Sequence, residues 1–129
     1  MYDITVLIID DQQTMHSILR SLLHQADIRD ILDAENVRDG LEIIENPTAP
    51  TPDIIICDLH MDVIDGMEFV HHLRRAKNMT PVLVLTGERD GLLRDVVAQA
   101  GATKILTKPI SAPDLRAEIL SAIGFQDDA

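Results

Sequence analysis

Five apolar runs alternate along the chain with segments in which apolar residues recur at helical spacing. The runs are ITVLII (4–9), DILDA (30–34), DIIIC (53–57), PVLVLT (81–86) and TKILT (103–107). Three of them are continuous stretches of Ile, Val and Leu, which is typical of parallel strands buried on both faces. The pattern therefore predicts five strands of a parallel sheet.

The segments that follow these runs have the spacing of amphipathic helices. The clearest stripe is Met15, Ile18, Leu19, Leu22 and Leu23, which stand at i, i+3, i+4, i+7 and i+8. The other stripes are Leu41 and Ile44; Phe69, Val70 and Leu73; Leu92, Leu93, Val96 and Val97; and Leu115, Ile119 and Ile123.

Residues typical of helix ends flank several of these segments. Asn36 and Ser111 each stand three residues before an aspartate, which favours an N-cap at both positions, and Gly101 suits a helix C-terminus. Alternating strands and helices imply right-handed crossovers. We therefore expect an α/β fold, a (βα)5 three-layer sandwich with a parallel five-stranded sheet. At 129 residues the chain should form one domain, residues 1–129.

The formal net charge of −11 excludes binding to nucleic acid through a basic surface and disfavours contact with anionic membranes. We see no apolar stretch near the roughly 18 residues of a membrane-spanning helix, and no signal peptide. The single cysteine cannot form an internal disulfide, which fits a reducing cytoplasm. Proteins, metal cations and small phosphorylated donors are the favoured partners.

Polar residues stand where four of the predicted strands end. Asp10 and Asp11 follow the first strand, Asp58 the third and Lys108 the fifth, while Thr86 ends the fourth. The carboxyl ends of parallel strands lie at one edge of a sheet, where such folds bind their ligands. We therefore expect three carboxylates, a hydroxyl and an ammonium to converge there.

The charges of this cluster favour a divalent cation. Two carboxylates ~4 Å apart at an effective dielectric constant of ~20 repel each other by about 4 kcal/mol. A third carboxylate raises the repulsion beyond what one lysine offsets. Oxygen ligands suit Mg²⁺, with Mn²⁺ as an alternative, better than Zn²⁺, which is bound mainly by Cys and His.

The remaining groups suit a phosphoryl oxygen cluster. Lys108 supplies a positive charge, Thr86 a hydroxyl donor, and the backbone N–H groups of His60 and Gly87 could complete the site. Asp58 is then the candidate nucleophile, forming an acyl phosphate while a metal neutralises the charge.

Asp10-Asp11, Asp58, Thr86 and Lys108-Pro109 on a chain of this length resemble the receiver domain of bacterial two-component response regulators. The resemblance runs from about Ile4 to about Ile123 and implies the flavodoxin-like strand order 2-1-3-4-5. It implies that Asp58 accepts a phosphoryl group from a histidine kinase or histidine phosphotransfer protein.

The ligand set is also implied by the resemblance. Asp11, Asp58 and the His60 carbonyl would bind Mg²⁺ directly and Asp10 through water, while Thr86 and Lys108 would hold the phosphoryl group and relay a switch.

The resemblance further implies a stand-alone regulator of cytoplasmic signal transduction, without an effector domain. It would act as a phosphorelay phosphoprotein and not as an enzyme, apart from its own phosphorylation and autodephosphorylation. A downstream protein would be its target, and it would be a monomer or a weak phosphorylation-dependent dimer.

Four positions depart from the family pattern or vary within it. Ile105 stands where the family usually has Tyr or Phe coupled to Thr86, so an aromatic gate cannot operate. Asp62 stands where Pro is common and adds negative charge. His60 and Glu88 occupy the variable positions that tune dephosphorylation in the family.

Other interpretations compete with this one. Asp11 alone could be an N-cap, Cys57 is most simply a small buried residue, and His16 and His24 are expected at the surface. A metal-dependent phosphatase with an aspartyl nucleophile would need an acid at the position of His60. A flavodoxin-like cofactor carrier would need Ser, Thr and Gly after the first strand, where this chain has Asp10-Asp11. A phosphorylation-independent pseudo-receiver usually lacks part of the acid–lysine set, which is complete here.

Overall fold

The computed structural model describes residues 3–58, 63–87, 95 and 97–124, and for residues 63–65 the backbone alone. Its strands are β1 (Thr5–Ile9), β2 (Asp30–Ala34), β3 (Ile54–Asp58), β4 (Val82–Thr86) and β5 (Lys104–Thr107). All neighbouring pairs are parallel, and the order in the sheet is β2-β1-β3-β4-β5. The predicted fold class and strand order are confirmed.

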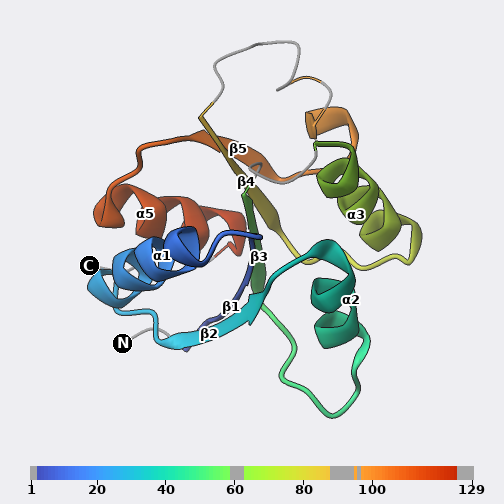
Figure 1. Cartoon of the computed structure of the whole chain (residues 1–129), viewed down its shortest axis with the longest axis horizontal. Coiled ribbons are helices and arrows are strands. Elements are labelled where there is room, and N and C mark those ends of the chain that lie inside the picture. Colours follow the sequence, from blue (N-terminus) through green and yellow to red (C-terminus); the bar gives the residue numbers. More distant parts are fainter. Residues whose placement is uncertain (1–2, 59–62, 88–94, 96, 125–129) are drawn as a thin grey trace.

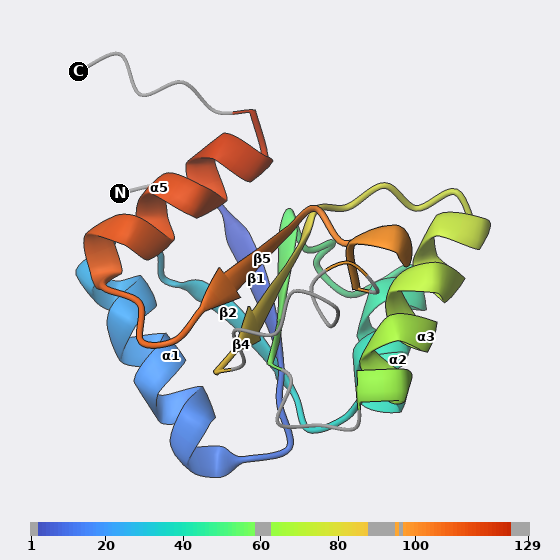
Figure 2. The same ribbon diagram turned by 90° about the horizontal axis from the view of Figure 1, so that it is seen from above.

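Helices cover both faces of this sheet. α1 (Gln13–Gln25) and α5 (Ala112–Ala122) lie on one face, and α2 (Val37–Glu45) and α3 (Val63–Arg75) lie on the other (Figures 1 and 2). The helix predicted around residues 92–97 falls largely outside the described residues, although residues 97–99 are helical. Within the part of the chain described, no helix is long and apolar enough to cross a membrane.

Alternation of side chains along the strands divides the core into two parts. Val6 and Ile8 of β1 belong to the cluster that contains Leu19 of α1 and Leu115 of α5. Leu7 and Ile9 of β1 pack in the second cluster, with Phe69, Val70 and Leu73 of α3. Every residue of β3 and β4 is buried, which explains why their sequences are continuous apolar runs.

Two of the predicted helix caps are confirmed. The Asn36 side chain accepts a hydrogen bond from the Asp39 N–H at 2.8 Å, and the Ser111 hydroxyl oxygen accepts one from the Asp114 N–H at 3.2 Å. Asp11 as the N-cap of the first helix is wrong. Gln12 holds that position without a side-chain capping bond, because α1 begins one residue later than such a cap requires.

Arg74 joins α3 to the segments that precede β4 and β5. Its guanidinium donates to the carbonyl oxygens of Gly101 at 3.0 Å, Asn78 at 2.9 Å and Thr80 at 2.8 Å. Partial burial lowers the pKa of the Arg74 guanidinium. Gly101 has φ 111°, and a Cβ there would stand 2.9 Å from Cγ of Arg74, so glycine is required on both backbone and packing grounds.

We expect Arg74→Met to destabilise the protein by about 2 kcal/mol, because carbonyls in this partly buried turn lose their charged donor. Arg75→Met is the matched control, since Arg75 is exposed on the same helix turn. Urea unfolding followed by circular dichroism measures both. Equal stability of the two variants would contradict this role of Arg74.

Candidate functional site

Two carboxylates lie side by side at the carboxyl edge of the sheet. Asp58 ends β3, and Asp10 follows β1 directly; neither exposes any surface. Ile9 is paired with Cys57 in the sheet register, so the next position of each strand brings Asp10 beside Asp58. Adjacent strands are ~5 Å apart, which places these two acids in each other's electrostatic field.

Lys108 contacts the Asp58 carboxylate. Its Nζ atom lies 2.8 Å from Oδ1 and 2.7 Å from Oδ2 of Asp58. The Lys108 main chain is fixed as well, because its N–H donates to the Thr86 carbonyl at 2.9 Å. The Lys108-Pro109 peptide bond is cis. The sheet therefore brings Asp58, Thr86 and Lys108 to one edge, as predicted from their positions after three separate strands.

Asp10 is held by main-chain contacts on two sides. Its N–H donates to the Ala34 carbonyl of β2 at 3.1 Å, and its Oδ1 atom accepts the Gln12 N–H at 2.9 Å. This carboxylate therefore has a fixed direction before any ligand arrives.

His16 was expected at the surface, and this was wrong: it is buried against the Asp10 carbonyl. The helical spacing carried a signal for it, because His16, Leu19 and Leu23 stand at i, i+3 and i+7 and are the buried residues of α1. A histidine within an apolar stripe is easily assigned to the polar face. His24, by contrast, is exposed as expected.

Both carboxylates affect the pKa of the neighbouring Cys57 thiol. Burial raises the pKa of its thiol to about 12, and the negative charges of Asp58 and Asp10 add to the rise. A thiol in this position is protonated at neutral pH and is not a redox sensor, which supports its interpretation as a small buried residue.

Thr86 and Ile105 lie on the same face of the sheet. Thr86 is the last residue of β4 and is buried, and Ile105 is half-buried in the second core cluster. The register pairs Val84 with Ile105, so Thr86 is two residues beyond that pair on the same side. Gly87 is exposed, with nothing within 4 Å of the position of a Cβ. His60, Asp62 and Glu88 lie outside the described residues.

The carboxylate oxygens of this cluster are ligands of the type that hard divalent cations bind. Asp10 and Asp58 offer only oxygen ligands, and with the Lys108 ammonium they carry a net formal charge of −1. Asp11 is exposed, and among the described residues no group of three His, Cys, Asp or Glu side chains is placed to hold a metal. The ligand set of Asp10, Asp11, Asp58 and the His60 carbonyl therefore stays a prediction.

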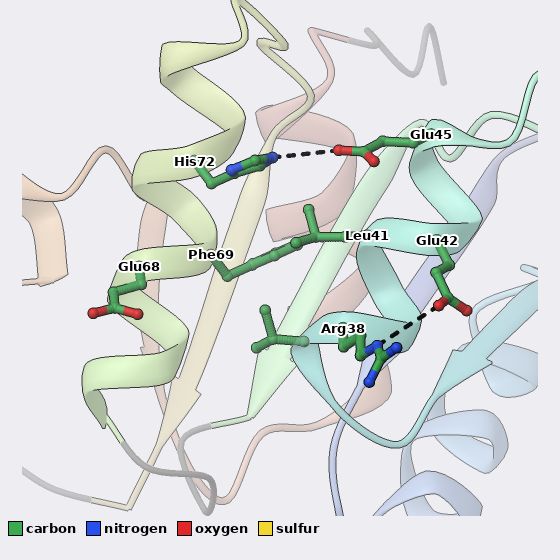
Figure 3. Close-up of a pocket in the computed structure, with 8 residues that line it drawn as sticks. Arg38, Leu41, Glu42, Glu45, Glu68, Phe69 and His72 are labelled. Atoms are coloured by element: carbon green, nitrogen blue, oxygen red, sulfur yellow. Dashed lines mark hydrogen bonds and ion pairs between the residues drawn. The ribbon is translucent and has the colours of Figure 1, made fainter.

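A surface groove of about 530 Å³ lies elsewhere, between α2 and α3 (Figure 3). Leu41 and Phe69 face each other across it, and four of its polar residues form the pairs Arg38–Glu42 and His72–Glu45. It shares no residue with the strand-end cluster, so the groove is separate from the candidate site.

The raised pKa of Cys57 gives a testable pH dependence in metal-free protein. Between about pH 9 and about pH 12 the unfolded chain loses the thiol proton and the folded chain retains it, so stability falls as pH rises, by up to ~1.4 kcal/mol per unit. We expect the stability of the wild type relative to Cys57→Ala to decline over this range. Chemical unfolding in EDTA at several pH values measures it, and a constant difference would contradict the assignment.

Comparison with known proteins agrees with the resemblance to receiver domains that the strand order supports. Residues 6–120 match the family described as the response regulator receiver domain. The chain is 31% identical over 123 residues to the probable chemotaxis protein CheY of Rhizobium etli, covering 94% of this chain and 93% of that protein. The crystal structure of a response regulator receiver domain protein from Clostridium thermocellum matches with a TM-score of 0.80 and 30% identity, covering 94% of each chain.

Other curated relatives are longer than this chain. The alkaline phosphatase synthesis transcriptional regulatory protein PhoP of Bacillus subtilis is 28% identical over 114 residues, which are 88% of this chain and 46% of that protein. The chain thus spans less than half the length of that relative. The match over residues 6–120, together with the strand order and the strand-end acids, shows that the chain belongs to the response regulator receiver domain family.

Proposed function

We propose that Asp58 accepts a phosphoryl group from the phosphohistidine of a histidine kinase or histidine phosphotransfer protein, and that the phosphorylated form binds a downstream protein. The observation that carries this proposal is the fully buried Asp58 carboxylate, which is contacted through both oxygens by Lys108 and lies next to Asp10. A phospho-acceptor role is general to the family to which the chain belongs.

The transfer exchanges one bond for another. An Asp58 carboxylate oxygen attacks phosphorus, the P–N bond of phosphohistidine breaks with its electron pair going to the imidazole, and an acyl phosphate forms. Lys108 already contacts both oxygens of the acceptor, so its ammonium is within reach of the new phosphoryl oxygens. The Thr86 hydroxyl and the N–H groups of His60 and Gly87 would complete the phosphoryl site.

A divalent cation, Mg²⁺ or Mn²⁺, is the proposed cofactor. Asp10, Asp11, Asp58 and the His60 carbonyl would hold it, and when bound it would neutralise charge on the phosphoryl oxygens. The support is electrostatic: two fully buried acids share this edge with one lysine, so the approach of a phosphoryl dianion needs more positive charge than the side chains provide.

The proposed switch couples Thr86 to Ile105 by packing. These residues lie on one face of the sheet, and the Lys108 N–H binds the Thr86 carbonyl, so a movement of Thr86 toward a phosphoryl group would act on β5. Glu88 and His60 would tune dephosphorylation. We further propose that this domain acts in the cytoplasm and catalyses no reaction beyond its own phosphorylation and dephosphorylation.

An apolar groove beside Lys108 is the proposed docking place for the phosphodonor. It has a volume of about 400 Å³ and is lined mainly by Met15, Ile18, Leu22, Pro109 and Ile110. Ile18 is 47% exposed, which is unusual for a large apolar side chain in this fold. Because the groove is bordered by Lys108, a donor bound there would present its phosphohistidine to Asp58.

Acetyl phosphate with Mg²⁺ tests the acceptor. We expect one labile phosphoryl adduct in the intact mass of the wild type and none in Asp58→Asn, because an amide cannot form the acyl phosphate. Asp53→Asn is the control, since Asp53 precedes the same strand at its opposite end. An adduct that persists in Asp58→Asn, or steady hydrolysis of phosphoesters by the wild type, would refute the proposal.

The docking proposal separates protein donors from small ones. We expect Ile18→Ser to slow transfer from a phosphorylated histidine phosphotransfer protein about tenfold, because a central apolar contact is lost. Labelling by acetyl phosphate should be unchanged. The matched control is Met79→Ser, an exposed apolar side chain outside the groove. Equal slowing with both donors would place the effect in the acceptor site, and equal behaviour of the two variants would remove the docking role.

A further inference from the structure

A chain of hydrogen bonds runs from the surface to the main chain of Asp10. Arg20 contacts Asp33 of β2, the other Asp33 oxygen lies 2.9 Å from Nδ1 of His16, and Nε2 of His16 contacts the carbonyl oxygen of Asp10. Arg20 and Asp33 are partly exposed, whereas the His16 side chain is 9% exposed. The chain therefore links a solvent-facing ion pair to the acid edge of the sheet.

Both nitrogens of the His16 ring face oxygen atoms that can only accept. A carboxylate has no hydrogen to give at neutral pH, and a peptide carbonyl never has one. The Asp10 carbonyl can only accept, so Nε2 of His16 donates to it, while Nδ1 of His16 faces the Asp33 carboxylate.

The acceptor on Asp10 belongs to the peptide unit that joins Asp10 to Asp11. The N–H of Asp10 is bound to Ala34, and its side chain accepts the Gln12 N–H. These contacts fix the strand end and the carboxylate, and His16 contacts the carbonyl. Rotation of that peptide would change the direction in which Asp11 leaves the sheet edge.

We propose that His16 is a positioning residue, which holds the Asp10–Asp11 peptide in one orientation and so pre-orders the acid pair for a divalent cation. Groups that orient metal ligands through hydrogen bonds contribute strongly to metal affinity. This inference rests on the proposed function for its metal, but its geometry concerns this chain alone.

The first test uses the metal-free protein. NMR of protein labelled with ¹⁵N in histidine should show an Nε2–H group on His16 that exchanges slowly with solvent, and none of this kind on the exposed His24. In Asp33→Ala the Nε2–H signal of His16 should broaden, because the contact that holds the other ring nitrogen is gone. A His16 ring without a hydrogen on Nε2 would overturn the proposal.

The second test measures Mg²⁺ affinity by titration followed by backbone NMR shifts. We expect His16→Leu to weaken Mg²⁺ binding about tenfold or more. Labelling by acetyl phosphate should fall at low Mg²⁺ and recover at saturating Mg²⁺, because the chemical groups remain. His16→Arg, a side chain that can donate to two acceptors, should restore most of the affinity.

Matched variants separate positioning from stability. Leu23→Ala should destabilise α1 without touching Asp10, and His24→Leu changes an exposed histidine of the same helix; both should bind Mg²⁺ like the wild type. If His16→Leu does not fold, Asp33→Ala provides the same test, with a smaller loss expected. Wild-type Mg²⁺ affinity in a folded His16→Leu or Asp33→Ala would overturn the positioning role. A wild type that neither binds Mg²⁺ nor accepts phosphate would instead refute the proposed function and leave the NMR result to decide the geometry.

Discussion

The Asp58 carboxylate exposes no surface, at the end of a strand that is buried along its whole length. Removing a carboxylate from water is costly unless an opposite charge and hydrogen bonds replace the solvent. Lys108 provides that charge from the end of β5, two strands away at the same edge of the sheet. Much of the remaining structure can be understood as what is needed to bring these two side chains together: parallel strands in register, with Lys108 directly after β5.

In the proposed function, the same contact would make the site responsive to phosphorylation. The Lys108 N–H is bound to the carbonyl of Thr86, so a change in the charge of Asp58 would act on two strands. Ile105 lies on the face of the sheet that Thr86 occupies, so the apolar core would be the route for that change where an aromatic side chain is lacking.

The acid edge is asymmetric in how it is supported. Asp58 is supported by a charge, whereas Asp10 is supported by main-chain groups and by His16, which reaches it from α1. Because His16 is in turn bound to Asp33, the first two strands and the first helix contribute to the position of one residue. Such support from outside the immediate site explains why its geometry can be fixed before a ligand binds.

The sequence by itself determined the strands, their parallel order through family resemblance, two N-caps and the residues at each strand end, because these depend on local periodicity and on one general rule about parallel sheets. It also identified Asp58 and Lys108 as neighbours although fifty positions separate them. Tertiary structure decided that His16 is buried and that Gln12 holds the helix start. The helical spacing indicated the face of α1 on which His16 lies, but its burial and the first residue of the helix depend on how closely α1 approaches the end of β1. That distance is set by packing between elements and not by the spacing of residues within one.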